Sequence, residues 1–182
     1  MKKLPYIVGI CLPALMLLSQ PISANDEHRE HDAHEHGTAL LNVAIEENSL
    51  HIEFESPAMN IVGFEHKANS GKNKLAIKNA VNRLKQGESL FITPEKAQCK
   101  LAHAEIESSL IEKTEEHEEH NETHSEFHVS YVFNCNNISA LTTINTQIFN
   151  LFRGSEKILA QIISNTGQTQ KELTPSQHIL NF

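Results

Sequence analysis

The chain is short of basic residues, and this shortage excludes one large class of partner. It has 15 lysines and arginines against 23 aspartates and glutamates in 182 residues, which gives a formal net charge of −8 with histidine neutral. Such a balance repels phosphate groups and raises the local concentration of cations. We therefore expect no nucleic-acid partner.

The chain also lacks an apolar run long enough to span a membrane. Its longest run, Leu4 to Leu18, has about 15 residues, whereas a spanning helix needs roughly 20. This run follows Met1-Lys2-Lys3 and precedes the small residue Ala24, which is typical of a cleaved export signal. We predict a signal peptide over residues 1–24 and a mature chain that is exported and inserts into no membrane.

Cysteine is scarce, and one of the three cysteines, Cys11, lies in the predicted signal peptide. The other two, Cys99 and Cys135, form an even set in an exported chain, so we expect them to pair as a disulfide. A bridge over that loop would stabilise the fold by about 4 kcal/mol in the chain-entropy model. Two free buried thiols and a zinc-thiolate site are the alternatives.

Histidine, by contrast, is abundant: the chain has 12, and most lie in two acidic stretches. We call these stretches the first histidine-rich segment (residues 25–36) and the second histidine-rich segment (residues 111–126). Their histidines, together with one that follows the second segment, are His28, His31, His34, His36, His117, His120, His124 and His128.

Both segments have too few apolar residues to bury a core. We therefore expect residues 25–33 to form a disordered tail and residues 111–126 a long charged loop. Imidazoles that alternate with carboxylates favour loose capture of a transition-metal ion. The alternative is a solvated run of charges whose histidines have no function.

Between these segments the periodicity of apolar residues predicts strands in adjacent pairs. Alternating apolar residues indicate strands, and Asn-, Ser- or Gly-containing turns separate them. The predicted strands lie at about 36–46, 50–56, 90–92, 97–103, 127–135, 158–163 and 168–173. The two strands that flank the second histidine-rich segment each carry a cysteine, which indicates a hairpin closed by a disulfide.

Apolar residues at helical spacing predict two helices. Ile77, Ala80, Val81 and Leu84 recur on one face of a helix over about residues 73–86. Ser139 is a suitable N-cap for a second helix that would end near Gly154. We predict one α+β domain over residues 34–182, an antiparallel sheet built from hairpins with two helices packed on it.

His34 and His36 stand out as a candidate metal site. Two residues apart on a strand, their side chains project from the same face. Zinc usually takes four ligands, so the rest of the site must come from elsewhere in the chain.

Several stretches resemble the ZrgA family of zinc-regulated periplasmic proteins. The resemblance rests on His34-Glu35-His36-Gly37 leading into Ala39–Ala44, on the stretch from Leu50 to His66, on Ala97-Gln98-Cys99 and Tyr131–Cys135, and on Leu151-Phe152-Arg153-Gly154. It covers nearly the whole mature chain. It implies a periplasmic, zinc-binding, non-enzymatic role that supports zinc uptake alongside an ABC importer.

The resemblance also carries metal-binding residues onto this chain: His34, His36 and His66. Glu65 is then either a fourth ligand or an acceptor that fixes the tautomer of a ligating imidazole. His103 shares strand parity with Cys99 and Leu101, which favours a buried core histidine, and the alternative is a ligand that completes the zinc shell. The expected partners are the zinc ion and the periplasmic binding protein or the permease of an importer.

Two other functions fit the same residues. A site of three histidines with an open water position is typical of a zinc hydrolase, with Glu65 as the one candidate base. A passive metal buffer with no partner is the other alternative. Nitrogen ligands prefer copper over zinc in vitro, so ligand type alone does not identify the metal.

Overall fold

The computed structural model describes residues 35–111, 125–165 and 167–182. These residues belong to one compact unit, Ala33–Phe182. The predicted signal peptide, the tail at 25–33 and most of the second histidine-rich segment lie outside the described residues. Among the described helices, none is long and apolar enough to cross a membrane.

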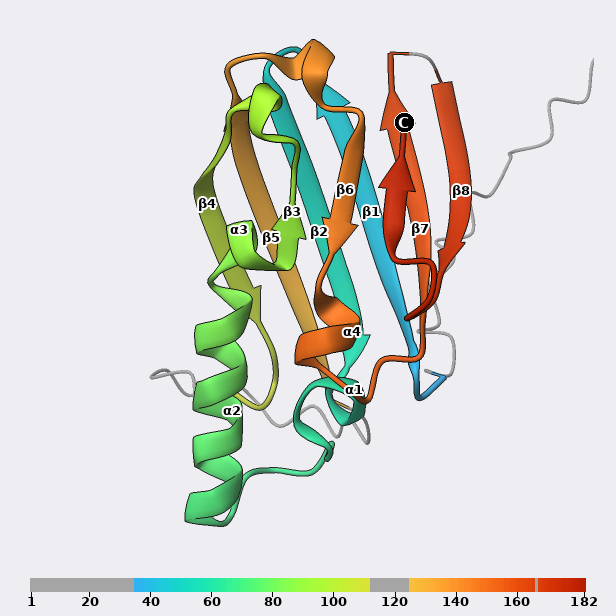
Figure 1. Cartoon of the computed structure of the whole chain (residues 1–182). Helices are drawn as coiled ribbons and strands as arrows, with labels where there is room; N and C mark the ends of the chain where they lie inside the picture. The colour runs from blue at the N-terminus through green and yellow to red at the C-terminus, as the bar shows by residue number, and fades with distance from the viewer. Residues whose placement is uncertain (1–34, 112–124, 166) are drawn as a thin grey trace, which may run out of the picture. The chain divides into compact units, whose positions relative to one another are not determined.

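A six-stranded sheet forms the centre of the domain (Figure 1). All neighbouring strands are antiparallel except β1 and β7, which are parallel. In spatial order the strands are β4 (Cys99–Glu107), β5 (Glu126–Cys135), β2 (Ser49–Pro57), β1 (Thr38–Glu46), β7 (Lys157–Ser164) and β8 (Gly167–Leu173).

One face of this sheet is apolar and buried, because alternate residues of each central strand are large and apolar. Phe127, Val129, Tyr131 and Phe133 of β5 are at most 2% exposed, and the inward residues of β1, β2 and β7 are equally buried. The residues between them point to the other side of the sheet. We call that other side the open face.

A second layer covers the apolar face, and Figure 1 shows it in front of the large sheet. Tyr131 joins the two layers: its hydroxyl donates to the carbonyl of Leu84 at 2.7 Å, and its ring meets Phe91 edge-on. The layer consists of the three-stranded sheet β3 (Phe91–Ile92), β6 (Thr143–Thr146) and β9 (Ile179–Asn181), with helices α1 (Ala58–Val62), α2 (Gly71–Leu84), α3 (Gly87–Leu90) and α4 (Ile148–Leu151) and two 3-10 turns, Glu95–Ala97 and Ile138–Ala140.

The helix predicted near residues 73–86 is confirmed as α2. Ser70 caps its start by accepting a hydrogen bond from the amide of Asn73 at 3.1 Å. Ile77, Ala80 and Leu84 are buried against the sheet. The helical spacing of apolar residues therefore identified the face that packs on the core.

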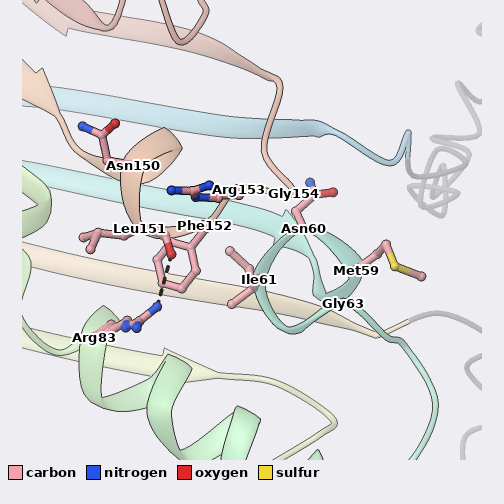
Figure 2. Close-up of a pocket in the computed structure, with 10 residues that line it drawn as sticks. All are labelled: Met59, Asn60, Ile61, Gly63, Arg83, Asn150, Leu151, Phe152, Arg153 and Gly154. Carbon is pink, nitrogen blue, oxygen red and sulfur yellow. Dashed lines mark hydrogen bonds between the residues drawn. The ribbon is translucent and has the colours of Figure 1, made fainter.

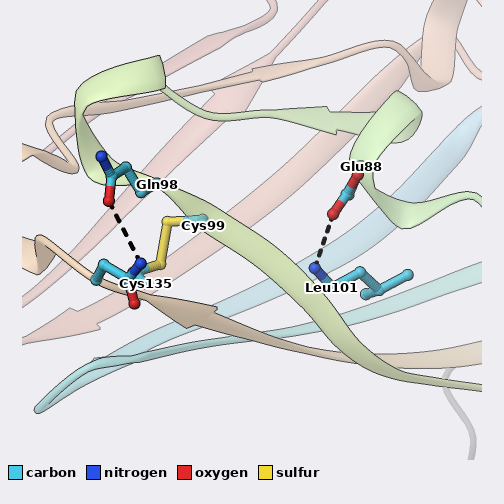
Figure 3. Close-up of a disulfide and its surroundings, with 6 residues drawn as sticks. Glu88, Gln98, Cys99, Leu101 and Cys135 are labelled. Atoms are coloured by element: carbon cyan, nitrogen blue, oxygen red, sulfur yellow. Dashed lines mark hydrogen bonds between the residues drawn. A yellow bond between two sulfur atoms is a disulfide. The ribbon is translucent and has the colours of Figure 1, made fainter.

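The predicted disulfide between Cys99 and Cys135 is also present (Figure 3). The two cysteines are directly opposite each other in the β4–β5 ladder. Beside the bridge, the carboxylate of Glu88 accepts a hydrogen bond from the amide of Leu101 at 3.0 Å. The disulfide closes the end of the hairpin that is remote from the second histidine-rich segment, so it pins the register of both strands.

Two features of the predicted architecture were wrong. Residues 139–154 form no long helix: the 3-10 turn Ile138–Ala140, β6 and α4 follow one another. The ladder of β6 with β3 and β9 prevails over helical spacing that Leu141, Ile144, Ile148 and Leu151 share. The sheet is also mixed, because β7 returns through a long connection and lies parallel to β1.

Candidate metal centre

Three potential metal ligands meet on the open face at one end of the sheet. Phe127 and Val129 of β5 point into the core, so Glu126 and His128 on either side of Phe127 point outward. The ladder then places Glu55 of β2 directly opposite His128 on one side and Glu107 of β4 opposite it on the other. We call Glu55, Glu126 and His128 the cation group.

The atoms of the cation group lie close enough for one ion. One ligand atom from each residue lies within 4.8 Å of the other two, and no other such group of three occurs in the described ranges. The imidazole of His128 has Nε2 3.1 Å from an oxygen of Glu126 and Nδ1 3.6 Å from an oxygen of Glu55. Each ring nitrogen therefore faces a different carboxylate.

The surrounding carboxylates raise the pKa of His128 above its usual value of 6.5. The largest cause is the hydrogen bond to Glu126, and the charges of Glu55, Glu126 and Glu107 act in the same direction. Partial burial of the ring opposes them. A site that favours a positively charged imidazolium in this way also favours a metal cation in its place.

The donor set suits a borderline metal such as zinc. Zinc binds imidazole nitrogen and carboxylate oxygen at about 2.0–2.2 Å, which places ligand atoms of a tetrahedral shell roughly 3.3 Å apart. The cation group needs only small side-chain movements to reach that spacing. Three protein ligands leave a fourth position for water or for another side chain.

A second histidine–carboxylate contact lies just before β1. Nε2 of His36 is 3.1 Å from an oxygen of Glu65, and the side chain of His36 is 53% exposed whereas that of Glu65 is 11% exposed. Two of the predicted site residues, 29 positions apart in sequence, are thus in contact. We call this contact the His36–Glu65 pair.

Asn60 of α1 holds the chain that carries His36. Its amide oxygen accepts from the amide of Gly37 at 2.7 Å, and its amide nitrogen donates to the carbonyl of Thr38 and to the hydroxyl of Ser56. Gly37 has a φ of 87°, a backbone conformation that favours glycine. A buried asparagine and a glycine turn therefore set the position of His36.

Gly154 lets this asparagine lie where it does (Figure 2). A Cβ atom on Gly154 would be 2.6 Å from the carbonyl oxygen of Asn60, so no other residue fits without a shift of the backbone. Asn60 and Gly154 line a cleft that Arg83 and Asn150 also line. There, Arg83 donates to the carbonyl of Leu151 at 3.3 Å. Residues 151–154 thus have a packing role in the structure.

Ser125 links the two histidine–carboxylate contacts. It precedes Glu126, its hydroxyl donates to the carbonyl of Glu65 at 2.9 Å, and its carbonyl accepts from the amide of Ala58. Ser125 is also the first described residue after the second histidine-rich segment, and Glu35 is the first after residues 1–34. Both histidine-rich segments therefore join the fold at the end of the sheet that carries the cation group.

The remaining predicted site residues are more scattered. The Nδ1 atom of His66 is 3.0 Å from the carbonyl oxygen of Lys67, and its ring stacks on Phe64; no described group of three ligands contains it. His28, His31, His34, His117, His120 and His124 lie outside the described residues. Of the predicted ligands, His128 belongs to the cation group, while His36 and Glu65 form their own pair.

The expectation that His103 is buried was wrong. Its side chain is 63% exposed, and Nε2 lies 3.8 Å from an oxygen of Glu105. The cause is a shift of register in the β4–β5 ladder between Leu101 and His103. An extra residue at a bulge reverses the strand parity, so His103 leaves the core face and joins the open face.

Glu55 and Glu126 were missed by sequence reasoning. A sequence pattern could have identified Glu126, since it alternates with Phe127 and shares strand parity with His128. No sequence pattern identifies Glu55, because only the pairing of β2 with β5 brings it next to His128. Its place depends on the strand register.

A sheet that gathers two carboxylates and an imidazole, with histidine-rich segments joining at the same end, is characteristic of a metal-binding domain. The chain belongs to the ZrgA family: the model of this family, described as ZrgA family zinc uptake protein, matches residues 33–182. A search of the curated proteins finds no match to the chain. The family assignment connects the chain with zinc uptake.

Proposed function

We propose that this protein is a non-enzymatic periplasmic zinc-binding protein that captures zinc and passes it to an ABC zinc importer. The cation group is the observation that carries this proposal. It supplies one nitrogen and two carboxylate oxygens within 4.8 Å of one another, which matches the ligand preferences of zinc. The assignment to a zinc uptake family supports zinc as the cargo.

In this proposal the sheet provides the tight site. Glu55, Glu126 and His128 extend from adjacent, hydrogen-bonded strands, and ligands on such strands are held more precisely than ligands on loops. One ring nitrogen of His128 binds the ion together with one oxygen each of Glu55 and Glu126, and the other ring nitrogen keeps its proton.

The two histidine-rich segments collect zinc for this site. Their imidazoles and carboxylates bind the ion weakly and raise its concentration near the end of the sheet where both segments join the fold. A weak external store beside one stronger site suits a protein that must release its cargo to an importer. The fourth zinc position, open in the cation group, is where an incoming ligand from the partner would attack.

The site predicted from His34, His36 and His66 remains a competing proposal. His36 and Glu65 are already in contact, and His66 would have to move toward them to complete a zinc shell with His34. Glu65 would then ligate directly or accept a hydrogen bond from a ligating imidazole. The two centres use different residues, so substitutions separate them.

Zinc titration of the mature protein in competition with a chromophoric chelator tests the proposal. We expect a Glu126→Gln, His128→Ala double variant to lose the tightest site and to keep the weak sites. The control is His178→Ala, which removes an exposed histidine whose ring contacts the Pro175 carbonyl. A double variant that binds the tightest zinc ion with unchanged affinity would refute the role of the cation group.

Transfer requires its own test. Zinc-loaded protein is mixed with the metal-free binding protein of the importer, and the metal in each is measured after separation. We expect zinc to move faster than it dissociates from the loaded protein into excess chelator. Equal rates would mean release into solution, as from a passive buffer.

A further inference from the structure

We propose that the open face carries a second divalent-cation site, formed by His51 and Glu53 of β2 with Asn42 of β1. The site takes a borderline transition-metal ion such as zinc. It extends the proposed function and uses none of the residues of the cation group. The domain would therefore bind two ions on the sheet itself, in addition to those held by the histidine-rich segments.

The proposed site lies in a hollow of the open face. The hollow has a volume of about 320 Å³, and its lining includes Asn42, Ala44, His51, Glu53, Gln161 and Ile163. Ala44 pairs with His51 on one side and with Ile163 on the other. The small alanine between two longer side chains leaves space above the sheet for a ligand.

Strand register brings the polar groups to one edge of this hollow. Asn42 is directly opposite Glu53 on β2 and opposite Gln161 on β7. His51 is two residues before Glu53, so both side chains leave β2 on the same face. Opposite residues in a ladder lie about 5 Å apart, and residues i and i+2 about 7 Å apart. We infer from this register that the three side chains can turn toward one ion above Asn42.

The arrangement resembles that of the cation group, except that the residue on the next strand lies opposite the glutamate and not opposite the histidine. There, His128 and Glu126 are two residues apart on one strand, and Glu55 stands opposite on the next strand. Here His51 and Glu53 are two residues apart, and Asn42 stands opposite. Strand β4, which lies on the other side of β5 from β2, carries His103 and Glu105 with the same spacing, on the same face. Three adjacent strands thus present a histidine and a glutamate to the open face.

The polar groups of the hollow are available to a ligand. In the part of the chain that the structure describes, the side chains of Asn42, His51, Glu53 and Gln161 form no hydrogen bond or ion pair with another protein group. The residues that line the hollow include no lysine or arginine. The lining therefore opposes an anion, whereas imidazole nitrogen, carboxylate oxygen and amide oxygen are ligands for a cation.

NMR of the histidine side chains tests the second site in the mature protein. Zinc is added stepwise, and the imidazole nitrogen signals of His51 and His128 are followed. We expect the His51 signals to change with saturation and to keep that change in the Glu126→Gln, His128→Ala variant. In a Glu53→Gln, Asn42→Ala variant the change at His51 should be lost, and the zinc content at saturation should fall by one ion.

The two proposals fail in different ways. If the His51 signals stay constant up to saturation with zinc, the second site does not exist, whatever His128 does. A change at His51 that is equally large in the Glu53→Gln, Asn42→Ala variant indicates binding to a lone imidazole and also refutes the site. If His51 responds and His128 does not, the cation group is refuted and the second site stands. The His178→Ala variant is the control for loss of any exposed histidine.

Discussion

The cation group and the His36–Glu65 pair both put histidine next to glutamate, but their supports differ. Glu55, Glu126 and His128 stand on two neighbouring strands of a six-stranded sheet, whereas His36 precedes β1 and Glu65 follows α1. The sheet brings three ligands within 4.8 Å, and the loops bring two side chains into contact. A ladder fixes side chains at regular spacing, so we expect the tighter ion at the sheet.

The largest expected effect is on the zinc affinity of the tightest site when either the cation group or the His36–Glu65 pair is changed. Glu126→Gln with His128→Ala should weaken the tightest site by at least about 100-fold, because loss of even an outer hydrogen-bond partner costs about 10–100-fold. His36→Ala with Glu65→Gln should weaken it by about tenfold or less. Competition titration of both double variants measures the difference.

One result would show that the His36–Glu65 pair, and not the cation group, binds the tightest zinc ion. If the His36→Ala, Glu65→Gln variant loses the tightest site and the Glu126→Gln, His128→Ala variant keeps it, the loops hold the ion. The centre would then be the one that includes His34 and His66. Circular dichroism and thermal unfolding of both variants verify that neither change disrupts the fold.

A second prediction tests whether the residues that position the His36–Glu65 pair are separate from those that position the cation group. Asn60→Ala removes three hydrogen bonds from a buried residue and should destabilise the fold by about 3 kcal/mol, because the amide of Gly37 and its neighbours lose their partner. It should also loosen His36 relative to Glu65. Chemical denaturation measures the first effect, and NMR of the His36 ring measures the second.

The matched control for Asn60 lies in the same cleft. Asn150 is exposed and bonds to the side chain of Gln147, so Asn150→Ala should change stability by no more than about 0.5 kcal/mol. Zinc affinity at the cation group should stay near that of the wild type in both variants. A large loss of zinc affinity in Asn60→Ala would mean that the two places are coupled through Ser125.

A third prediction concerns the second histidine-rich segment. Deletion of residues 113–123 should lower the number of zinc ions bound and leave the tightest affinity and the thermal transition nearly unchanged, because such a polar segment buries little apolar surface. The deletion keeps Ser125 and Glu126, which belong to the sheet and its contacts. Loss of the fold would show that the segment is structural, and an unchanged zinc number would show that it does not bind zinc.

The smallest expected effect is on the titration of His128. Its pKa is raised chiefly by the hydrogen bond to Glu126, so Glu126→Gln should lower it toward the usual value. Because the raised pKa favours the native state with imidazolium, this stabilisation is complete below the unfolded pKa and is lost as pH rises through the native pKa. NMR titration and unfolding of zinc-free protein between about pH 5 and pH 8 measure both changes.

Zinc reverses this pH dependence, because protons and the ion compete for the same ring nitrogen. Zinc affinity of the wild type should rise as pH increases through the raised pKa of His128. In Glu126→Gln the rise should begin at lower pH. An identical His128 titration in both proteins would mean that Glu126 does not hold the imidazolium.

Sequence patterns were most successful where the physical cause is local. Alternation in β1, β2 and β5 and helical spacing in α2 reflect side chains that lie on one face of one element, so each pattern could be recognised without its partner. Leu141 to Leu151 failed for the opposite reason. Pairing of β6 with β3 and β9 supplies hydrogen bonds that no local pattern records.

The sequence by itself determined the acidic, histidine-rich character of the chain, the disulfide and most of the residues that face the core. It also identified His36 and Glu65 as candidate metal ligands. The tertiary structure alone decided that Glu55 lies opposite His128, that His103 faces outward after a bulge, and that Asn42 borders the same hollow as His51 and Glu53. Those places depend on the register between strands far apart in the chain. A shift of one residue in that register would turn every one of these side chains to the other face of the sheet.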